Sequence, residues 1–123
     1  MKTILLAEDD PAIRELLRET LCDLGYGVQE VDNGVAVLEV LQQGTPDLLL
    51  MDIQMPRMDG CTVVNCLRHQ RQYAGLPVVA LTANAMRGDR EWVLAAGFDA
   101  YCTKPIDFAA LTAEIERLIG GSS

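Results

Sequence analysis

Short apolar runs alternate five times with longer segments whose apolar residues recur at helical spacing, and this alternation constrains the fold more than any other feature. Parallel strands need long crossovers, usually helices, so five strand–helix repeats favour a doubly wound α/β fold, with helices on both faces of a parallel sheet. We expect strands over residues 3–7, 27–31, 47–51, 77–81 and 100–103. We expect helices over residues 11–24, 34–43, 60–71, 86–96 and from 108 to near the C-terminus.

Residues that suit helix ends mark several of these boundaries. Asp10 is expected to cap the first helix, with Pro11 in its first turn, and Gly25 is expected to end it. Asp59 and Asp107 are expected to cap the third and fifth helices in the same way.

The chain shows no second domain and no repeat beyond the strand–helix unit. We therefore expect one domain over residues 1–120 and a flexible Gly-Ser tail over residues 121–123. No apolar run is long enough to span a bilayer, and no signal peptide is evident, so we expect no membrane association.

The chain is acidic, with 18 Asp and Glu residues against 10 Lys and Arg, for a formal net charge of −8. Such a surface repels a phosphate backbone, so we expect no direct nucleic-acid binding.

The cysteines form no C-x-x-C pair and His69 is the only histidine, which argues against a zinc site. We expect reduced thiols and a cytoplasmic location.

Polar side chains follow four of the five expected strands. The carboxyl ends of parallel strands meet at one edge of a sheet, where ligands of such folds bind. We therefore expect the following residues to converge there: Glu8, Asp9 and Asp10 after the first strand, Asp52 after the third, Thr82 after the fourth and Lys104 after the fifth.

Carboxylates this close repel one another, and a hard divalent cation would remove the conflict. Mg²⁺ prefers oxygen ligands and shares phosphate oxygens, so it is the expected cofactor. Asp9 and Asp52 are the expected ligands, with Glu8 acting directly or through a water, and a backbone carbonyl just after Asp52 could complete the set.

Beside such a cation, a carboxylate can accept a phosphoryl group and form an acyl phosphate. The task of the site is then to position the group and stabilise its charge. Asp52 is the expected acceptor, Lys104 supplies a point charge for one phosphoryl oxygen, and the Thr82 hydroxyl can donate to another. Before phosphorylation, Lys104 is expected to pair with Asp52.

Nearly the whole chain resembles the receiver domain of response regulators. Four pieces carry the resemblance, in order and at matching spacing: residues 4–10 (ILLAEDD), residues 46–60 (PDLLLMDIQMPRMDG), residues 77–83 (PVVALTA) and residues 97–105 (GFDAYCTKP). The resemblance implies a flavodoxin-like (βα)5 fold with strand order 2-1-3-4-5. The stretch over residues 80–86 is similar to receivers of hybrid histidine kinases and of single-domain cell-cycle regulators.

The resemblance also implies roles for particular residues. Asp52 would be the phosphoacceptor, Glu8 and Asp9 the acidic pair, and Gln54 a magnesium ligand through its main-chain carbonyl. The switch hydroxyl would be Thr82, the switch aromatic Tyr101 and the phosphate-contacting residue Lys104. A cis peptide is implied before Pro105.

The same resemblance implies a signalling domain rather than an enzyme, one that assists its own phosphorylation and slow dephosphorylation. The phosphoryl donor would be a phosphohistidine on a sensor histidine kinase or a histidine phosphotransfer protein. Phosphorylation would switch a surface formed by the fourth helix, fifth strand and fifth helix, which a downstream effector protein reads, and a homodimer through the last helices is left open.

Simpler interpretations stand beside these roles. A helix cap is the favoured role of Asp10, and Thr82 could be a cap as well as a switch. Tyr101 could be a core aromatic, and Lys104 a surface residue. His69 is expected to face solvent, while Trp92 is either half-exposed packing or part of a partner surface.

Three other functions compete with a phosphoacceptor domain. An aspartyl-phosphate hydrolase would commonly carry a second Asp two residues after the nucleophile, where this chain has Gln54. A flavin-binding module would need a phosphate loop after the first strand, where the acids would repel the phosphate. The third alternative, a domain that binds partners without being phosphorylated, is left open by the sequence.

Overall fold

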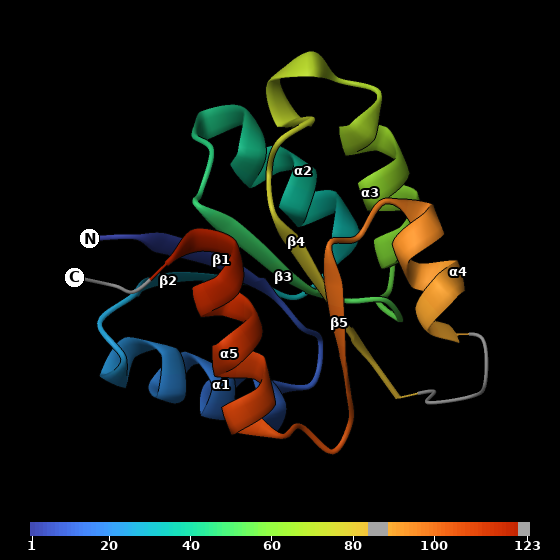
Figure 1. Cartoon of the computed structure of the whole chain (residues 1–123). Helices are drawn as coiled ribbons and strands as arrows, with labels where there is room; N and C mark the ends of the chain where they lie inside the picture. The colour runs from blue at the N-terminus through green and yellow to red at the C-terminus, as the bar shows by residue number, and fades with distance from the viewer. Residues whose placement is uncertain (84–88, 121–123) are drawn as a thin grey trace.

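A computed structural model of the protein describes residues 1–83 and 89–120. Five parallel strands form one sheet in the order β2-β1-β3-β4-β5, as expected (Figure 1). Their bounds are Thr3–Ala7 (β1), Gly27–Val31 (β2), Leu48–Asp52 (β3), Val78–Thr82 (β4) and Ala100–Thr103 (β5). The three central strands β1, β3 and β4 are almost wholly buried, which explains their continuous apolar sequences.

Helices cover both faces of the sheet (Figure 1). Helices α1 (Pro11–Asp23) and α5 (Phe108–Ile119) pack on one face, where Leu17, Leu21, Leu111 and Ile115 are buried. The other face is covered by α2 (Gly34–Gln43), α3 (Gly60–Arg68) and α4 (Asp89–Ala96). The protein is therefore the doubly wound α/β fold that the alternation predicts.

Three of the expected helix caps are present. Oδ1 of Asp10 accepts from the backbone of Ala12, at 2.9 Å, and of Ile13, while Asp59 and Asp107 cap α3 and α5 through one backbone N–H each. Asp10 thus begins α1, as its favoured interpretation predicts.

Two strands lie one residue further along the chain than predicted. β3 begins at Leu48, and Asp47 just before it contacts Thr3 twice: its N–H donates to the Thr3 carbonyl at 2.9 Å, and its side chain accepts from Thr3 N at 2.7 Å. β4 begins at Val78, since Pro77 has no N–H to give to a strand ladder. The shift makes Asp52 and Thr82 the last residues of their strands rather than the first residues after them.

The prediction that the third helix runs to about Arg71 was wrong. α3 ends at Arg68, and a short 3-10 helix follows over Arg71–Tyr73. The Arg68 guanidinium donates to the carbonyls of Tyr73 and Leu76, both at 2.9 Å, and so holds the chain after α3 in a turn. These bonds join residues of different elements, which helix periodicity does not report.

Three predictions fall outside the described residues. They are the start of the fourth helix at Met86, the nature of the tail over 121–123 and the exposure of the Trp92 side chain. Among the helices that are described, none has the length and apolar character needed to cross a bilayer.

Candidate functional site

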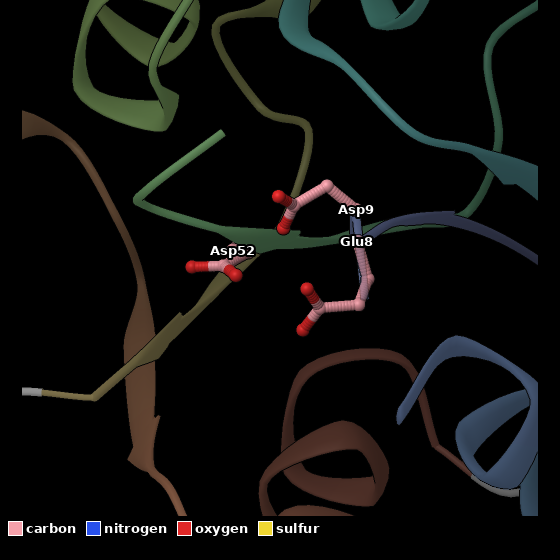
Figure 2. Close-up of side chains that lie close together, drawn as sticks. All are labelled: Glu8, Asp9 and Asp52. Atoms are coloured by element: carbon pink, nitrogen blue, oxygen red, sulfur yellow. The ribbon is translucent and has the colours of Figure 1, made fainter. Parts of the chain in front are cut away.

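Three carboxylates meet at the carboxyl end of the sheet (Figure 2). Glu8 and Asp9 directly follow β1, and Asp52 ends the neighbouring strand β3, where Ala7 is paired with Met51. One carboxylate oxygen from each of the three residues lies within 4.8 Å of the others. The expected convergence of these acids is therefore present.

Glu8 is the most deeply placed of the three acids. Its exposed fraction is 0%, whereas Asp9 is exposed. Oε2 of Glu8 accepts from Asp10 N at 3.2 Å, and Oε1 accepts no hydrogen bond from the described residues. Burial raises the pKa of Glu8 to about 7, with hydrogen bonding and charge repulsion from Asp52 adding to the rise and Lys104 and the Asp10 N–H opposing it.

Lys104 joins the acids from the other side of the site. Its Nζ lies 2.7 Å from Glu8 Oε1 and 2.8 Å from Asp52 Oδ2, and only the contact with Asp52 has hydrogen-bond geometry. Burial lowers the pKa of Lys104, but its close contacts with the Asp52 and Glu8 carboxylates and their charge attraction outweigh that effect and leave the pKa raised. The expected pairing of Lys104 with Asp52 is present.

The backbone around Lys104 fixes its approach. Lys104 N donates to the carbonyl of Thr82 at 2.8 Å, which ties the end of β5 to the end of β4. The Lys104–Pro105 peptide is cis, as the family resemblance implies. Lys104 therefore reaches the acids from the strand end predicted for it.

Asp52 lies between the lysine and the loop that follows β3. Its exposed fraction is 4%, and its Oδ1 accepts from Gln54 N at 2.9 Å. The Gln54 side chain is exposed, so its contribution to this site is made through the main chain. The carboxylate is thus oriented by one backbone donor and one ammonium.

Thr82 ends β4, and Tyr101 lies within β5. Thr82 is buried at the end of β4, and Tyr101 is half-buried against the core cluster that α2, α3 and α4 cover. Tyr101 is paired in register with Ala80, two residues before Thr82. Thr82 is thus at the carboxyl end of the strand next to the one that Asp52 ends, and Tyr101 lies one strand further along the sheet.

The donor set fits a hard divalent cation. It consists of carboxylate oxygens only, and among the described residues the buried Oε1 of Glu8 has the Lys104 ammonium at 2.7 Å but no donor with hydrogen-bond geometry. Three carboxylates with one ammonium leave a net negative site, which a cation would balance. Glu8, Asp9 and Asp52 could hold Mg²⁺, and the Gln54 carbonyl follows Asp52 closely enough in sequence to join them.

Other residues considered from the sequence lie apart from the cluster. His69 is exposed, and its Nδ1 lies 2.7 Å from the carbonyl of Asn65. All four cysteines are free, as expected.

Two supports of the site were missed by sequence reasoning. Arg14 donates from its guanidinium to the carbonyl of Glu8 at 2.9 Å, which fixes the backbone just before Asp9. At Gly60, an added Cβ would lie 2.8 Å from the carbonyl oxygen of Asp52, so only glycine allows α3 to begin this close to Asp52. The sequence places Gly60 after a helix cap but gives no signal of this contact.

Comparison with known proteins gives a consistent result. The model of the response regulator receiver domain family matches residues 4–116. The chain is 34% identical to the polar-differentiation response regulator DivK of Brucella anthropi, over 97% of each chain. It is 39% identical to part of the sensor histidine kinase GacS of Pseudomonas protegens, and the match covers 95% of this chain but 13% of the kinase.

A solved structure gives the same assignment. The receiver domain of sensor histidine kinase PA1611 from Pseudomonas aeruginosa has a magnesium ion coordinated in its active site cleft. It superposes with a TM-score of 0.88 at 37% identity, over 98% of each chain. With the fold, the strand-end acids and these matches in agreement, the chain belongs to the response regulator receiver domain family and is a signalling domain of two-component systems.

Proposed function

We propose that Asp52 accepts a phosphoryl group from a phosphohistidine, with Mg²⁺ held by Glu8, Asp9, Asp52 and the main-chain carbonyl of Gln54. The observation that carries the proposal is the position of the Asp52 carboxylate. It lies at a strand end between the Gln54 N–H and the Lys104 ammonium, with the other two acids within 4.8 Å. The donor would be a sensor histidine kinase or a histidine phosphotransfer protein.

In the proposed step, an Asp52 carboxylate oxygen forms a bond to phosphorus as the phosphorus–nitrogen bond of the donor breaks. The electron pair of that bond returns to the imidazole nitrogen, and Asp52 becomes an acyl phosphate. When bound, Mg²⁺ supplies positive charge that offsets both the acids and the incoming phosphoryl oxygens. Lys104 already points its ammonium at Asp52 and would transfer this contact to a phosphoryl oxygen.

The signal would leave the site through β4 and β5. The Thr82 hydroxyl would turn toward the new phosphoryl group, and Tyr101 would then turn inward from its half-buried position. Lys104 N donates a hydrogen bond to the Thr82 carbonyl, so a movement at the end of β4 would also displace the end of β5. Phosphorylation would thereby shift the populations of two conformations of the surface formed by α4, β5 and α5.

Residues 1–120 would act as one receiver domain, and an effector protein or a second copy of the chain would bind the switched surface. Since its cysteines are free, we also propose a reducing, cytoplasmic setting.

Membership in the receiver family argues against the flavin-binding module and the phosphohydrolase. The phosphorylation-independent interaction domain is the alternative that experiment must remove.

The test uses phosphoramidate, a small donor with the same phosphorus–nitrogen bond as phosphohistidine. With Mg²⁺ present, ³¹P spectra should show an acyl phosphate on the protein, and Asp52→Asn should show none. A protein that binds Mg²⁺ yet gives no acyl phosphate would leave only the phosphorylation-independent interaction domain.

A further inference from the structure

The loop between Asp52 and α3 carries the main-chain groups of the proposed metal site. Gln54 lies near its start, with its N–H on Asp52 Oδ1, and Gly60 closes it by donating to the carbonyl of Ile53 at 2.8 Å. The position of the Gln54 carbonyl therefore depends on how this loop is held between its two ends.

The middle of the loop contains a strained turn. Met58 N donates to the carbonyl of Pro56 at 2.8 Å, across Arg57, whose φ is 69°. A three-residue turn with positive φ at a non-glycine residue is rare and costs conformational energy, so surrounding contacts must hold it. Met58 meets a contact from another element of the fold.

That contact lies on α2, which supplies none of the proposed ligands. Gly34 is buried at the first position of α2, and a Cβ added there would lie 2.0 Å from the carbonyl oxygen of Met58 and 2.8 Å from its Cβ. Since real Cβ contacts essentially never fall below 3.0 Å, any side chain at this position must move the helix and the loop apart by about 1 Å. The capping residue Asn33, whose Oδ1 accepts from Ala36 N at 2.8 Å, fixes this first turn.

We propose that Gly34 is a positioning residue for the metal site: it sets the distance between α2 and the β3–α3 loop, and so the place of the Gln54 carbonyl. This inference rests on the proposed function, because it assumes that Gln54 is a ligand. It assigns a second glycine to the site, one on a different element from Gly60 and from every proposed ligand.

The test compares Mg²⁺ affinity by calorimetry, using Gly34→Ala and two matched variants. Gly44→Ala makes the same change at the other end of α2, where nothing lies within 4 Å of an added Cβ. Leu41→Ala weakens the core under the same helix, two turns or about 10 Å from the loop contact. Displaced outer supports of metal sites commonly reduce affinity by about tenfold to a hundredfold, so Gly34→Ala should bind Mg²⁺ at least about tenfold more weakly, and the two controls should match the wild type.

A second variant covers the case in which Gly34→Ala does not fold. Asn33→Ala removes the cap without a collision, and it should weaken Mg²⁺ binding several-fold while Leu41→Ala does not. The amide resonance of Gln54 should shift in Gly34→Ala or Asn33→Ala before metal is added, and stay in place in Gly44→Ala.

The outcomes separate the two proposals. Equal Mg²⁺ affinity of the folded Gly34→Ala or Asn33→Ala protein and of Leu41→Ala would overturn the positioning role and leave the metal site standing. No Mg²⁺ binding by the wild type would overturn the proposed function itself. Weaker binding only in the variants at the loop contact would support both.

Discussion

Glu8→Gln tests how the site balances a buried acid when no metal is bound. Burial raises the pKa of Glu8 from 4.5 to about 7, and glutamine imitates the protonated, neutral form of the side chain. The difference between these two pKa values corresponds to about 3 kcal/mol, at 1.36 kcal/mol for each pH unit. The ionised Glu8 should therefore cost folding about 3 kcal/mol above pH 7, after its attraction to Lys104 is included.

The sign of the pH dependence follows from which state binds more protons. Between pH 4.5 and about 7, the folded protein holds a proton on Glu8 that the unfolded chain has released. The free energy of unfolding should therefore fall as the pH rises through this window and level off above it. The raised pKa of Lys104 acts only at much higher pH, beyond this range.

Urea unfolding at pH 5 and pH 8 provides the assay, with and without Mg²⁺. Without Mg²⁺, Glu8→Gln should be more stable than the wild type by up to about 3 kcal/mol at pH 8, and the difference should fall below about 1 kcal/mol at pH 5. Added Mg²⁺ should stabilise the wild type by mass action and the variant much less. Lower stability of Glu8→Gln than of the wild type at pH 8 without Mg²⁺, or equal wild-type stability at pH 5 and pH 8, would contradict a raised pKa for Glu8.

Three further substitutions test other parts of the account. Lys104→Met should slow phosphorylation by acetyl phosphate about a hundredfold, because a charge aimed at the phosphoryl group is lost. The same change should tighten Mg²⁺ binding measured by calorimetry, because a competing cation is gone. Unchanged phosphorylation rates would contradict the role given to Lys104. Arg57→Gly should raise the free energy of unfolding by about 0.5–1 kcal/mol, since glycine adopts a φ of 69° without strain, and a loss of stability would show that the turn is not strained. Arg68→Met should lower the free energy of unfolding by about 3 kcal/mol, since it leaves several carbonyls and the Asp99 carboxylate without their donor. A loss below about 1 kcal/mol in urea unfolding would show that Arg68 does not stabilise the turn after α3.

Much of the fold follows from local signals in the sequence. The strands β1, β2 and β5 have the predicted bounds, because strong signals flank them: Asp10 and Pro11 after the first, Gly25 before the second and Pro105 after the last. The end of α3 could not be predicted, since it depends on carbonyls that Arg68 meets only after the sheet has formed.

The residues of the site could be predicted from the sequence, but the burial of each acid and the contacts that hold the site in place could not. Strand ends identify Glu8, Asp9, Asp52, Thr82 and Lys104, since parallel topology alone brings these positions to one edge. The sequence does not show that Glu8 is buried while Asp9 is exposed, because consecutive residues after a strand can turn either way. Nor does it show the contact between the first turn of α2 and the β3–α3 loop, which joins elements distant in the chain.

The central claim is that Asp52 takes a phosphoryl group with the help of Mg²⁺. The most direct test is the intact mass of the protein after incubation with acetyl phosphate, for the wild type and Asp52→Asn, each with and without Mg²⁺. One added phosphoryl group is expected in the wild type with Mg²⁺ and none in the other three samples. An adduct that persists in Asp52→Asn, or the absence of any adduct in a wild type that binds Mg²⁺, would contradict it.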